Sequence, residues 1–410
     1  MEIKLYPILT SGLYTELIQN AINDCSENGG GTVFFTKGVY ETGTIFWKSN
    51  VRIFLDFGAE IKGSENPEDY PKEVYKQMYK KESHMDRALF FAENCENIIL
   101  EGYGKINGNG ADMRATRPMM FRYLNTKNIR INNVKMEAPA SWTNAFINCQ
   151  NIWVSGIDIF SRANGNGDGL DFDACQNVFV SDCKFDCSDD CICLQNSFED
   201  KICENIVVTN CVFKTRWAGM RIGLLSCNTI KDLTVSNCIF RNIDCSGLKI
   251  QTAEGAVIEN MTFTNLVMED VVRPMLITAN KFRERTDRTE DINSPSILRN
   301  MTFNNIMFKS VNPEFLKGKE TQPKCITIDC DKGDVIENIM ISNMRMEVLG
   351  ENTYEEREIP SHTGIRAEGH NYKGLLPAYG LFARNVKDLE INNFDVKVQG
   401  DEKREKIVII

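Results

Sequence analysis

The sequence predicts an all-β fold, a single-stranded right-handed parallel β-helix (solenoid), and three observations support this prediction. A short pattern recurs along the chain, in which a polar residue and Asn or Asp precede alternating apolar positions. The first six copies begin 31, 23, 26, 28 and 27 residues apart, and Asn, Gly and Asp separate them. Strand-like alternation at this period indicates coils that bury their apolar faces on their neighbours. The copies begin at Glu96, Lys127, Gln150, Gln176, Glu204, Lys231, Glu259, Arg299, Glu337 and Lys387.

A leucine-rich repeat is the main alternative solenoid, but its LxxLxLxxN spacing is absent from these copies. Asn, Gly and Asp fall between the apolar runs, where tight turns need a positive φ. Asn and Cys also recur at fixed places, and Cys183, Cys211 and Cys238 each stand two residues before a Phe. We therefore expect side chains of one kind to stack from coil to coil.

The N-terminal region predicts a short capping helix. Apolar residues from Leu13 to Cys25 follow a helical spacing, and the run Gly29 to Gly31 ends it before a strand. A helix over the first coil would protect the open end of the solenoid. We expect one domain over residues 1–410, with the cap and first coil in 1–50 and regular coils in 88–400.

Composition excludes several classes of partner. The chain has 410 residues, 42% hydrophobic and 25% charged, with a formal net charge of -10. An acidic chain disfavours nucleic acid and anionic membranes as partners. No apolar run approaches the roughly 20 residues that span a bilayer. The N-terminus shows no basic region followed by an apolar core, so we expect a cytoplasmic protein unless a signal was trimmed. The fifteen cysteines are expected to be reduced core residues.

A second short strand in each repeat brings acidic residues together. Aligning the apolar pairs Leu170/Phe172, Ile192/Leu194, Met220/Ile222 and Leu248/Ile250 defines the columns of residues between and before them. One column holds Asp171, Cys193, Arg221 and Lys249, and the next holds Asp173, Gln195, Gly223 and Gln251. Asp168 and Asp190 share the column just before these strands. We therefore expect Asp168 and the Asp189/Asp190 pair within about one strand spacing, ~4.8 Å, on an exposed face.

Clustered carboxylates beside cations suit glycosidic cleavage. One protonated acid can donate to the glycosidic oxygen, while ionised partners activate a water molecule. Taken alone, the sequence around Asp168 reads equally well as an ordinary turn, and Asp189/Asp190 as a solvated loop. The register of the two acidic stretches, together with Arg221 and Lys249, favours the functional interpretation.

These residues resemble the polygalacturonase family of glycoside hydrolases, family 28, whose members are right-handed parallel β-helices. The family carries Asn-Thr-Asp, Gly-Asp-Asp, Gly-His-Gly and Arg-Ile-Lys on consecutive coils. Asn166 to Asp168 is similar to the first motif, and Ser188 to Asp190 to the second. "RPMMFRYLNTKNIRINNVKMEAPASW" and "LLPAYGLFARNVKDLEINNF" also resemble the family, and the resemblance covers nearly the whole chain.

The resemblance implies the roles of the site residues. Asp189 would be the general acid, and Asp168 with Asp190 would hold the attacking water in an inverting, metal-free reaction. The other residues implied to line the site and contact the oligosaccharide substrate are Asn166, Asp171, Gln195, Trp217, Arg221, Lys249 and Gln251. No cofactor is expected.

The chain departs from the family at two motifs. Where Gly-His-Gly is expected it reads Trp217-Ala218-Gly219, and Arg-Ile-Lys is replaced by Lys249-Ile250-Gln251. The three histidines, His84, His362 and His370, stand elsewhere. These changes leave the acids in place and alter the sugar-recognition set. We therefore expect an exo-acting glycosidase on small galacturonate- or rhamnose-containing oligosaccharides, with the charged segment Lys281 to Asp291 closing one end of its cleft.

Two alternatives differ in chemistry. A pectate-type lyase would use calcium held by the carboxylates, with Arg221 or Lys249 as the base. A non-catalytic carbohydrate-binding β-helix would need none of the acids in register. Calcium-dependent formation of an unsaturated product would favour the lyase.

Overall fold

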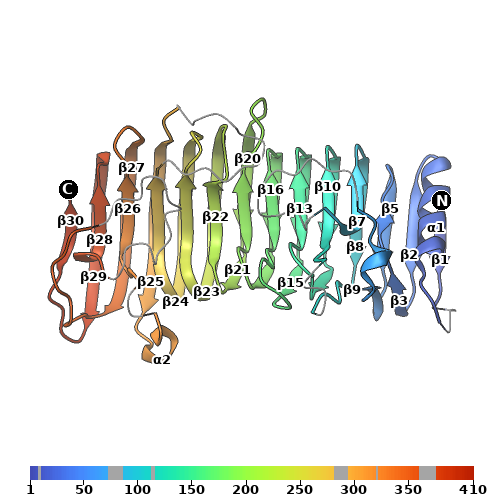
Figure 1. The fold of residues 1–410 in the computed structure, drawn as a ribbon, viewed down its shortest axis with the longest axis horizontal. Helices are drawn as coiled ribbons and strands as arrows, with labels where there is room; N and C mark the ends of the chain where they lie inside the picture. The colour runs from blue at the N-terminus through green and yellow to red at the C-terminus, as the bar shows by residue number, and fades with distance from the viewer. Residues whose placement is uncertain (8–10, 73–85, 112–115, 281–293, 320–321, 360–374) are drawn as a thin grey trace. The chain divides into compact units, whose positions relative to one another are not determined.

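A computed structural model describes residues 1–410 except 8–10, 73–85, 112–115, 281–293, 320–321 and 360–374. The chain divides into two compact units, Met1–Ile192 and Cys193–Ile410. Each unit is a stack of parallel coils (Figure 1), so the predicted fold class, a right-handed parallel β-helix, is confirmed. A single domain over 1–410 stays a prediction. The segment Lys281 to Asp291 and all three histidines lie outside the described residues.

Three stacks of parallel strands form the first unit, and each strand pairs with the strand one coil later. β2, β5, β8, β11, β14 and β17 form one stack, and β3, β6, β9, β12, β15 and β18 the second. β4, β7, β10, β13 and β16 form the third. The bounds are β1 (Glu2–Leu5), β2 (Gly31–Phe35), β3 (Gly38–Thr42), β4 (Ile45–Phe46), β5 (Val51–Leu55), β6 (Ala59–Gly63), η1 (Pro67–Asp69), β7 (Ala88–Glu93), β8 (Glu96–Gly102), β9 (Lys105–Asn107), β10 (Met119–Leu124), β11 (Lys127–Asn132), β12 (Lys135–Glu137), β13 (Asn144–Ile147), β14 (Gln150–Ser155), β15 (Asp158–Ser161), β16 (Leu170–Asp173), β17 (Gln176–Ser181) and β18 (Lys184–Cys187).

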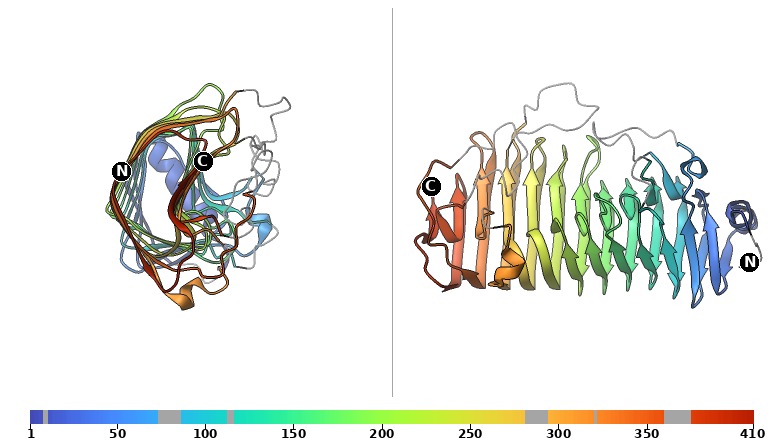
Figure 2. Two further views of the ribbon diagram at one scale, coloured as in Figure 1. Left: turned by 90° about the vertical axis from the view of Figure 1, so that its left-hand side faces the viewer. Right: turned by 60° about the horizontal axis from the view of Figure 1, so that its bottom comes forward.

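The helix α1 (Thr15–Glu27) lies across the end of the first coil (Figure 2, left). Its buried face consists of Ile18, Ala21, Ile22 and Cys25, which confirms the predicted cap. The helix is shifted by two residues from the prediction, because the Tyr14 N–H donates to Glu41 O (2.7 Å) and Asn28 N–H still donates to Asp24 O (3.2 Å).

The recurring asparagines occupy left-handed turns and bind one another. Asn50, Asn97, Asn128, Asn151 and Asn177 all have φ between 56° and 63°. Each of the last four donates its amide to the Asn one coil earlier, at 2.8, 2.8, 3.0 and 3.0 Å. Asn tolerates this conformation better than other non-glycine residues, so one residue type supplies both the turn and the hydrogen bond between coils.

Aromatic rings fill the interior of the first unit along the third stack. Phe90, Phe121, Tyr123, Phe146 and Phe172 stack in sequence, with centroids 4.7 to 5.9 Å apart. The strand spacing of ~4.8 Å is close to the preferred offset of stacked rings. The row fixes the register of β16, which leads directly from the first acidic loop.

Longer strands form the second unit, because consecutive faces continue without a break. Strand β23 pairs with β20, β21 and β22 on one side and with β24 on the other. The pairs β24–β25–β27–β29 and β24–β26–β28–β30 continue the stack. The bounds are β20 (Cys203–Thr209), β21 (Val212–Thr215), β22 (Ala218–Leu224), β23 (Ile230–Thr252), β24 (Val257–Ala279), β25 (Ile297–Ser310), α2 (Pro313–Leu316), β26 (Ile326–Cys330), β27 (Val335–Leu349), β28 (Ala378–Arg384), β29 (Lys387–Gln399) and β30 (Glu405–Ile409), while β19 (Ile192–Gln195) contains the boundary between the units.

All fifteen cysteines are free, and all but Cys227 are buried. Their predicted role as reduced core residues agrees with this placement. Within the described residues, no helix has the length and apolar character needed to cross a membrane.

Candidate active site

The two acidic loops run side by side immediately before β16 and β19. The Gly169 N–H donates to Asp190 O at 2.9 Å, and the Leu170 N–H donates to Cys191 O at 3.0 Å. This register brings Asp168 and Asp190 to neighbouring coils, so the predicted alignment of the first two acidic stretches is confirmed.

Glycine is required on both sides of Asp168. A Cβ at Gly167 would lie 2.3 Å from Ser161 O, and one at Gly169 would lie 2.4 Å from Cys191 O. Real Cβ atoms do not approach backbone oxygens so closely, so any larger residue would push the coils apart. The "NGDG" sequence is therefore explained by close packing of the loop that carries Asp168.

Hydrogen bonds fix both loops further. The Thr143 N–H and hydroxyl donate to Asp168 O at 3.0 and 2.7 Å. The Gly167 N–H donates to Ser188 Oγ at 3.0 Å, which links the first loop to the second. Arg162 Nε and Nη2 each lie 2.5 Å from Asp186 Oδ1. The backbone that carries the acids is thus held from both sides.

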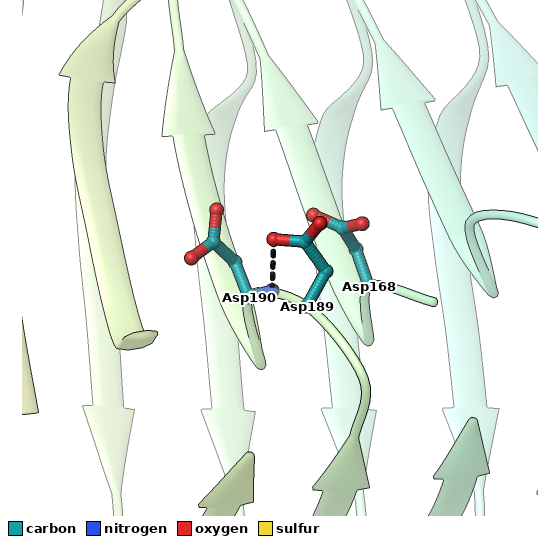
Figure 3. Close-up of side chains that lie close together, drawn as sticks. All are labelled: Asp168, Asp189 and Asp190. Atoms are coloured by element: carbon teal, nitrogen blue, oxygen red, sulfur yellow. Dashed lines mark hydrogen bonds between the residues drawn. The ribbon is translucent and has the colours of Figure 1, made fainter. Parts of the chain in front are cut away.

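The three carboxylates come together as a cluster. Asp168, Asp189 and Asp190 each offer one oxygen, and these oxygens all lie within 4.8 Å of one another. Figure 3 shows the three side chains projecting in the same direction, with Asp189 between the other two. The Asp190 N–H donates to Asp189 Oδ1 at 3.0 Å.

The acids differ in burial, and this corrects the expectation of an exposed cluster. Asp168 is 4% exposed and Asp190 0%, whereas Asp189 is half-buried. Two ionised carboxylates at such separations repel by about 3.5 kcal/mol at an effective dielectric constant of about 20. The cluster therefore retains a proton at pH values where an isolated aspartic acid would be ionised. A shared proton and one more accessible acid are what general acid catalysis needs.

Two further predicted residues of the first unit differ in exposure. Asn166 is exposed, and its amide Nδ2 donates to Asp189 Oδ2 at 3.4 Å. Asp171 is buried in β16, in register with Ala145 of β13. Sequence reasoning missed Arg117, which contacts Asn166. The Arg-Pro dipeptide at 117 and 118 carried no signal of a contact 49 residues away.

The remaining predicted residues belong to the second unit. Arg221 and Lys249 are direct neighbours on β22 and β23, as are Gly223 and Gln251, so the predicted columns are confirmed there. Lys249 Nζ lies 4.4 Å from the centroid of the Trp217 ring, a cation–π contact. A Cβ at Gly223 would lie 1.9 Å from Gln251 O, so glycine is needed at that position.

Lys249 and Gln251 are completely buried, although the columns were expected to face outward. The Gln251 amide donates to Thr278 Oγ1 at 3.3 Å. Gln195 is also buried, and its amide donates to Cys193 Sγ at 3.2 Å. Strand alternation predicts the face on which a side chain lies, but the sequence does not show which chain segments cover that face.

The acid cluster is also the group of described residues that could share a divalent cation. Carboxylate oxygens are the ligands that calcium and magnesium prefer, and three are close enough to meet one ion. Exposed and half-buried carboxylates commonly cluster without an ion. The cluster therefore fits acid–base chemistry and a cation equally well on geometry alone.

Comparison with known proteins identifies the family. The model of the glycosyl hydrolases family 28 matches residues 56–365. The polygalacturonase QRT2 of Arabidopsis thaliana is 24% identical over 318 residues, which cover 73% of this chain and 65% of that protein. The chain thus spans slightly less than two thirds of that relative's length.

Solved structures share the fold over almost the entire chain. A family 28 exopolygalacturonase of Yersinia enterocolitica superimposes with a TM-score of 0.75 at 19% identity, covering 97% of this chain and 75% of that one. A hyperthermoactive exopolygalacturonase of Thermotoga maritima gives 0.68 at 18% identity, covering 96% and 92%. With the family model matching most of its length and its acids clustered between two coils, this chain belongs to the glycosyl hydrolases of family 28.

Proposed function

We propose that the protein hydrolyses glycosidic bonds in pectin-derived oligosaccharides that contain galacturonate or rhamnose, and that it acts from a chain end. The observation that carries the proposal is the cluster of Asp168, Asp189 and Asp190 within 4.8 Å. The names of the relatives, a polygalacturonase and two exopolygalacturonases, support the substrate class and the exo mode.

Asp189 is proposed as the general acid. It is the most accessible member of the cluster, so it can reach a glycosidic oxygen, while Asp168 and Asp190 are buried behind it. The two buried acids are proposed to hold and activate the attacking water. Because a third acid is present, water activation and proton donation fall to separate groups.

The stereochemical outcome is proposed to be inversion, which the family resemblance implies. Carboxyl groups of inverting glycosidases usually lie about 6.5–9.5 Å apart and those of retaining enzymes about 5–5.5 Å. The oxygens here approach within 4.8 Å, so distance alone would suit a covalent intermediate. NMR of the first product formed decides the matter, since an anomer of retained configuration would make one aspartate a nucleophile.

Substrate recognition is proposed to involve Arg221, Lys249 and Gln251, with Asn166, Asp171, Gln195 and Trp217 as further contacts. Two positive charges on neighbouring strands suit an acidic or heavily hydroxylated sugar. Lys249 supplies a point charge and Gln251 only hydrogen bonds, so the recognition differs from that of an Arg-Ile-Lys site.

The test is a screen of purified protein against pectic oligosaccharides of defined length, with products identified by mass. Release of single sugars or dimers from one end would support the proposal. Rapid loss of viscosity on polygalacturonate with mid-chain products would overturn the exo assignment. Products with an unsaturated ring would indicate a lyase.

A further inference from the structure

We propose that Arg117 is a positioning residue for the general acid and that it acts through the Asn166 side chain. This inference rests on the proposed role of Asp189. Arg117 lies just before β10, far in sequence from both acidic loops. Its guanidinium Nη2 donates to Asn166 Oδ1 at 2.9 Å, and Asn166 Nδ2 donates to Asp189 Oδ2 at 3.4 Å. The three groups form one chain of hydrogen bonds.

The orientation of the Asn166 amide depends on this contact. An amide offers an acceptor on one side and donors on the other. When Arg117 donates to the oxygen, the nitrogen must face Asp189. An amide rotated by half a turn would place its oxygen against the carboxylate and its N–H groups against the guanidinium. The charge on Arg117 therefore selects the orientation in which Asn166 donates to the acid.

Arg117 is itself anchored at several points. Its Nη2 also donates to Gly165 O at 2.5 Å, and its Nε donates to Ala140 O at 3.3 Å. The Ser141 hydroxyl donates to Arg117 O at 3.0 Å. The guanidinium thus joins the loop before β13 to the loop that carries Asn166. A planar group with several fixed donors suits this bridge, and lysine would not replace it.

The backbone at Arg117 supports a specific role. Its φ is 45° and that of Asn166 is 52°. Asn adopts this region readily, but a long side chain such as Arg pays for it with strain of about 1–3 kcal/mol. The conformation places the half-buried guanidinium beside the acidic loop. Strain of this kind persists where the surrounding contacts hold the residue in place.

A double-mutant cycle tests the proposal. Arg117→Met keeps the length of the side chain and removes its donors, and Asn166→Ala removes the intermediate amide. We expect Arg117→Met to lower kcat about 10- to 100-fold with little change in KM, because small misplacement of a catalytic group is costly. The double variant should be no slower than Asn166→Ala alone, because the two residues act in series. Arg117→Lys should not restore the rate, whereas added guanidinium ions should restore part of it in Arg117→Ala.

Controls separate positioning from folding and from substrate contact. Arg130→Met removes an exposed arginine of the same unit that packs over Trp153, and it should leave kcat and KM unchanged. Multiplicative losses in the cycle would overturn the proposal, because independent effects mean that Arg117 does not act through Asn166. A rise in KM with unchanged kcat would also overturn it, since Arg117 would then bind substrate.

A structural measurement keeps the inference testable if no oligosaccharide is cleaved. In a crystal structure of Arg117→Met, the Asn166 amide should have turned or moved away from Asp189, while Arg130→Met should keep the wild-type contact. An Asn166–Asp189 contact that survives in Arg117→Met would refute the positioning role. Failure of the screen on oligosaccharides, by contrast, would refute the proposed substrate class and leave this result intact.

Discussion

Arg273 offers a prediction in which removing a charge stabilises the protein. It lies in β24, in register with Ser246 of β23, and none of its side chain is exposed. Its Nε, Nη1 and Nη2 have no hydrogen-bond partner among the residues that the structure describes. Burying an ion costs several kcal/mol even after relaxation, and only a good partner offsets that cost.

The substitution Arg273→Met replaces the guanidinium by an apolar group and keeps an unbranched stem that can refill the space. We expect the free energy of unfolding to rise by about 1–4 kcal/mol, the range seen when buried charges give way to well-packed apolar residues. For a chain of this length the entropy of unfolding at Tm is about 0.9 kcal/mol/K, so Tm should rise by about 1–5 °C.

A matched arginine provides the opposite result. Arg404 is also buried, but its Nη2 lies 2.6 Å from Glu402 Oε2 and its Nε 2.8 Å from Glu402 Oε1. Arg404→Met would leave a buried carboxylate without its cation, at a cost of about 3–5 kcal/mol. Thermal and urea unfolding of both variants give the comparison. If Arg273→Met lowered Tm as Arg404→Met does, the guanidinium would be stabilising and the reasoning would be wrong.

Four further outcomes follow from the site and from the buried thiols. Asp189→Asn should abolish turnover with Tm nearly unchanged, because the amide oxygen can still accept the Asp190 N–H; normal activity would exclude Asp189 as the acid. Arg221→Ala should lower kcat/KM by about 2–4 kcal/mol if the guanidinium pairs with a desolvated carboxylate, and unchanged kinetics would remove it from the site. Activity should survive dialysis against EDTA, and a loss that calcium reverses would support the lyase. Burial raises the pKa of Cys330 to about 12, so its stabilising contribution is complete below the ordinary thiol pKa and is lost between about pH 9 and 12; the alkaline fall in stability should be shallower in Cys330→Ala, and equal slopes would contradict this.

The repeat pattern predicted the fold and the register because a strand has only two faces. Once Met220/Ile222 and Leu248/Ile250 are aligned, Arg221 must fall beside Lys249, and the structure confirms it. The same logic placed Asp168 beside Asp190. Stacked coils leave no other register that keeps the apolar residues inside.

Burial and long-range contacts could not be predicted in the same way. The periodicity assigns a face to Lys249 but not the segments that cover it, so its complete burial was missed. Arg117 reaches Asn166 across 49 residues through a left-handed backbone conformation that no sequence pattern marks. Such contacts arise from loops, whose paths are set by packing rather than by the repeat.

The asparagine rows have a direction, and this bears on how the protein ages and evolves. In each row the later coil donates and the earlier coil accepts, from Asn177 back to Asn50 in one unit and from Asn338 to Asp232 in the other. The first member only has to accept, so a carboxylate serves there, as Asp232 shows. Deamidation of an interior member would remove a donor and set two acceptors against each other. The same direction lets a whole coil be gained or lost, since the flanking asparagines then meet each other in the same sense.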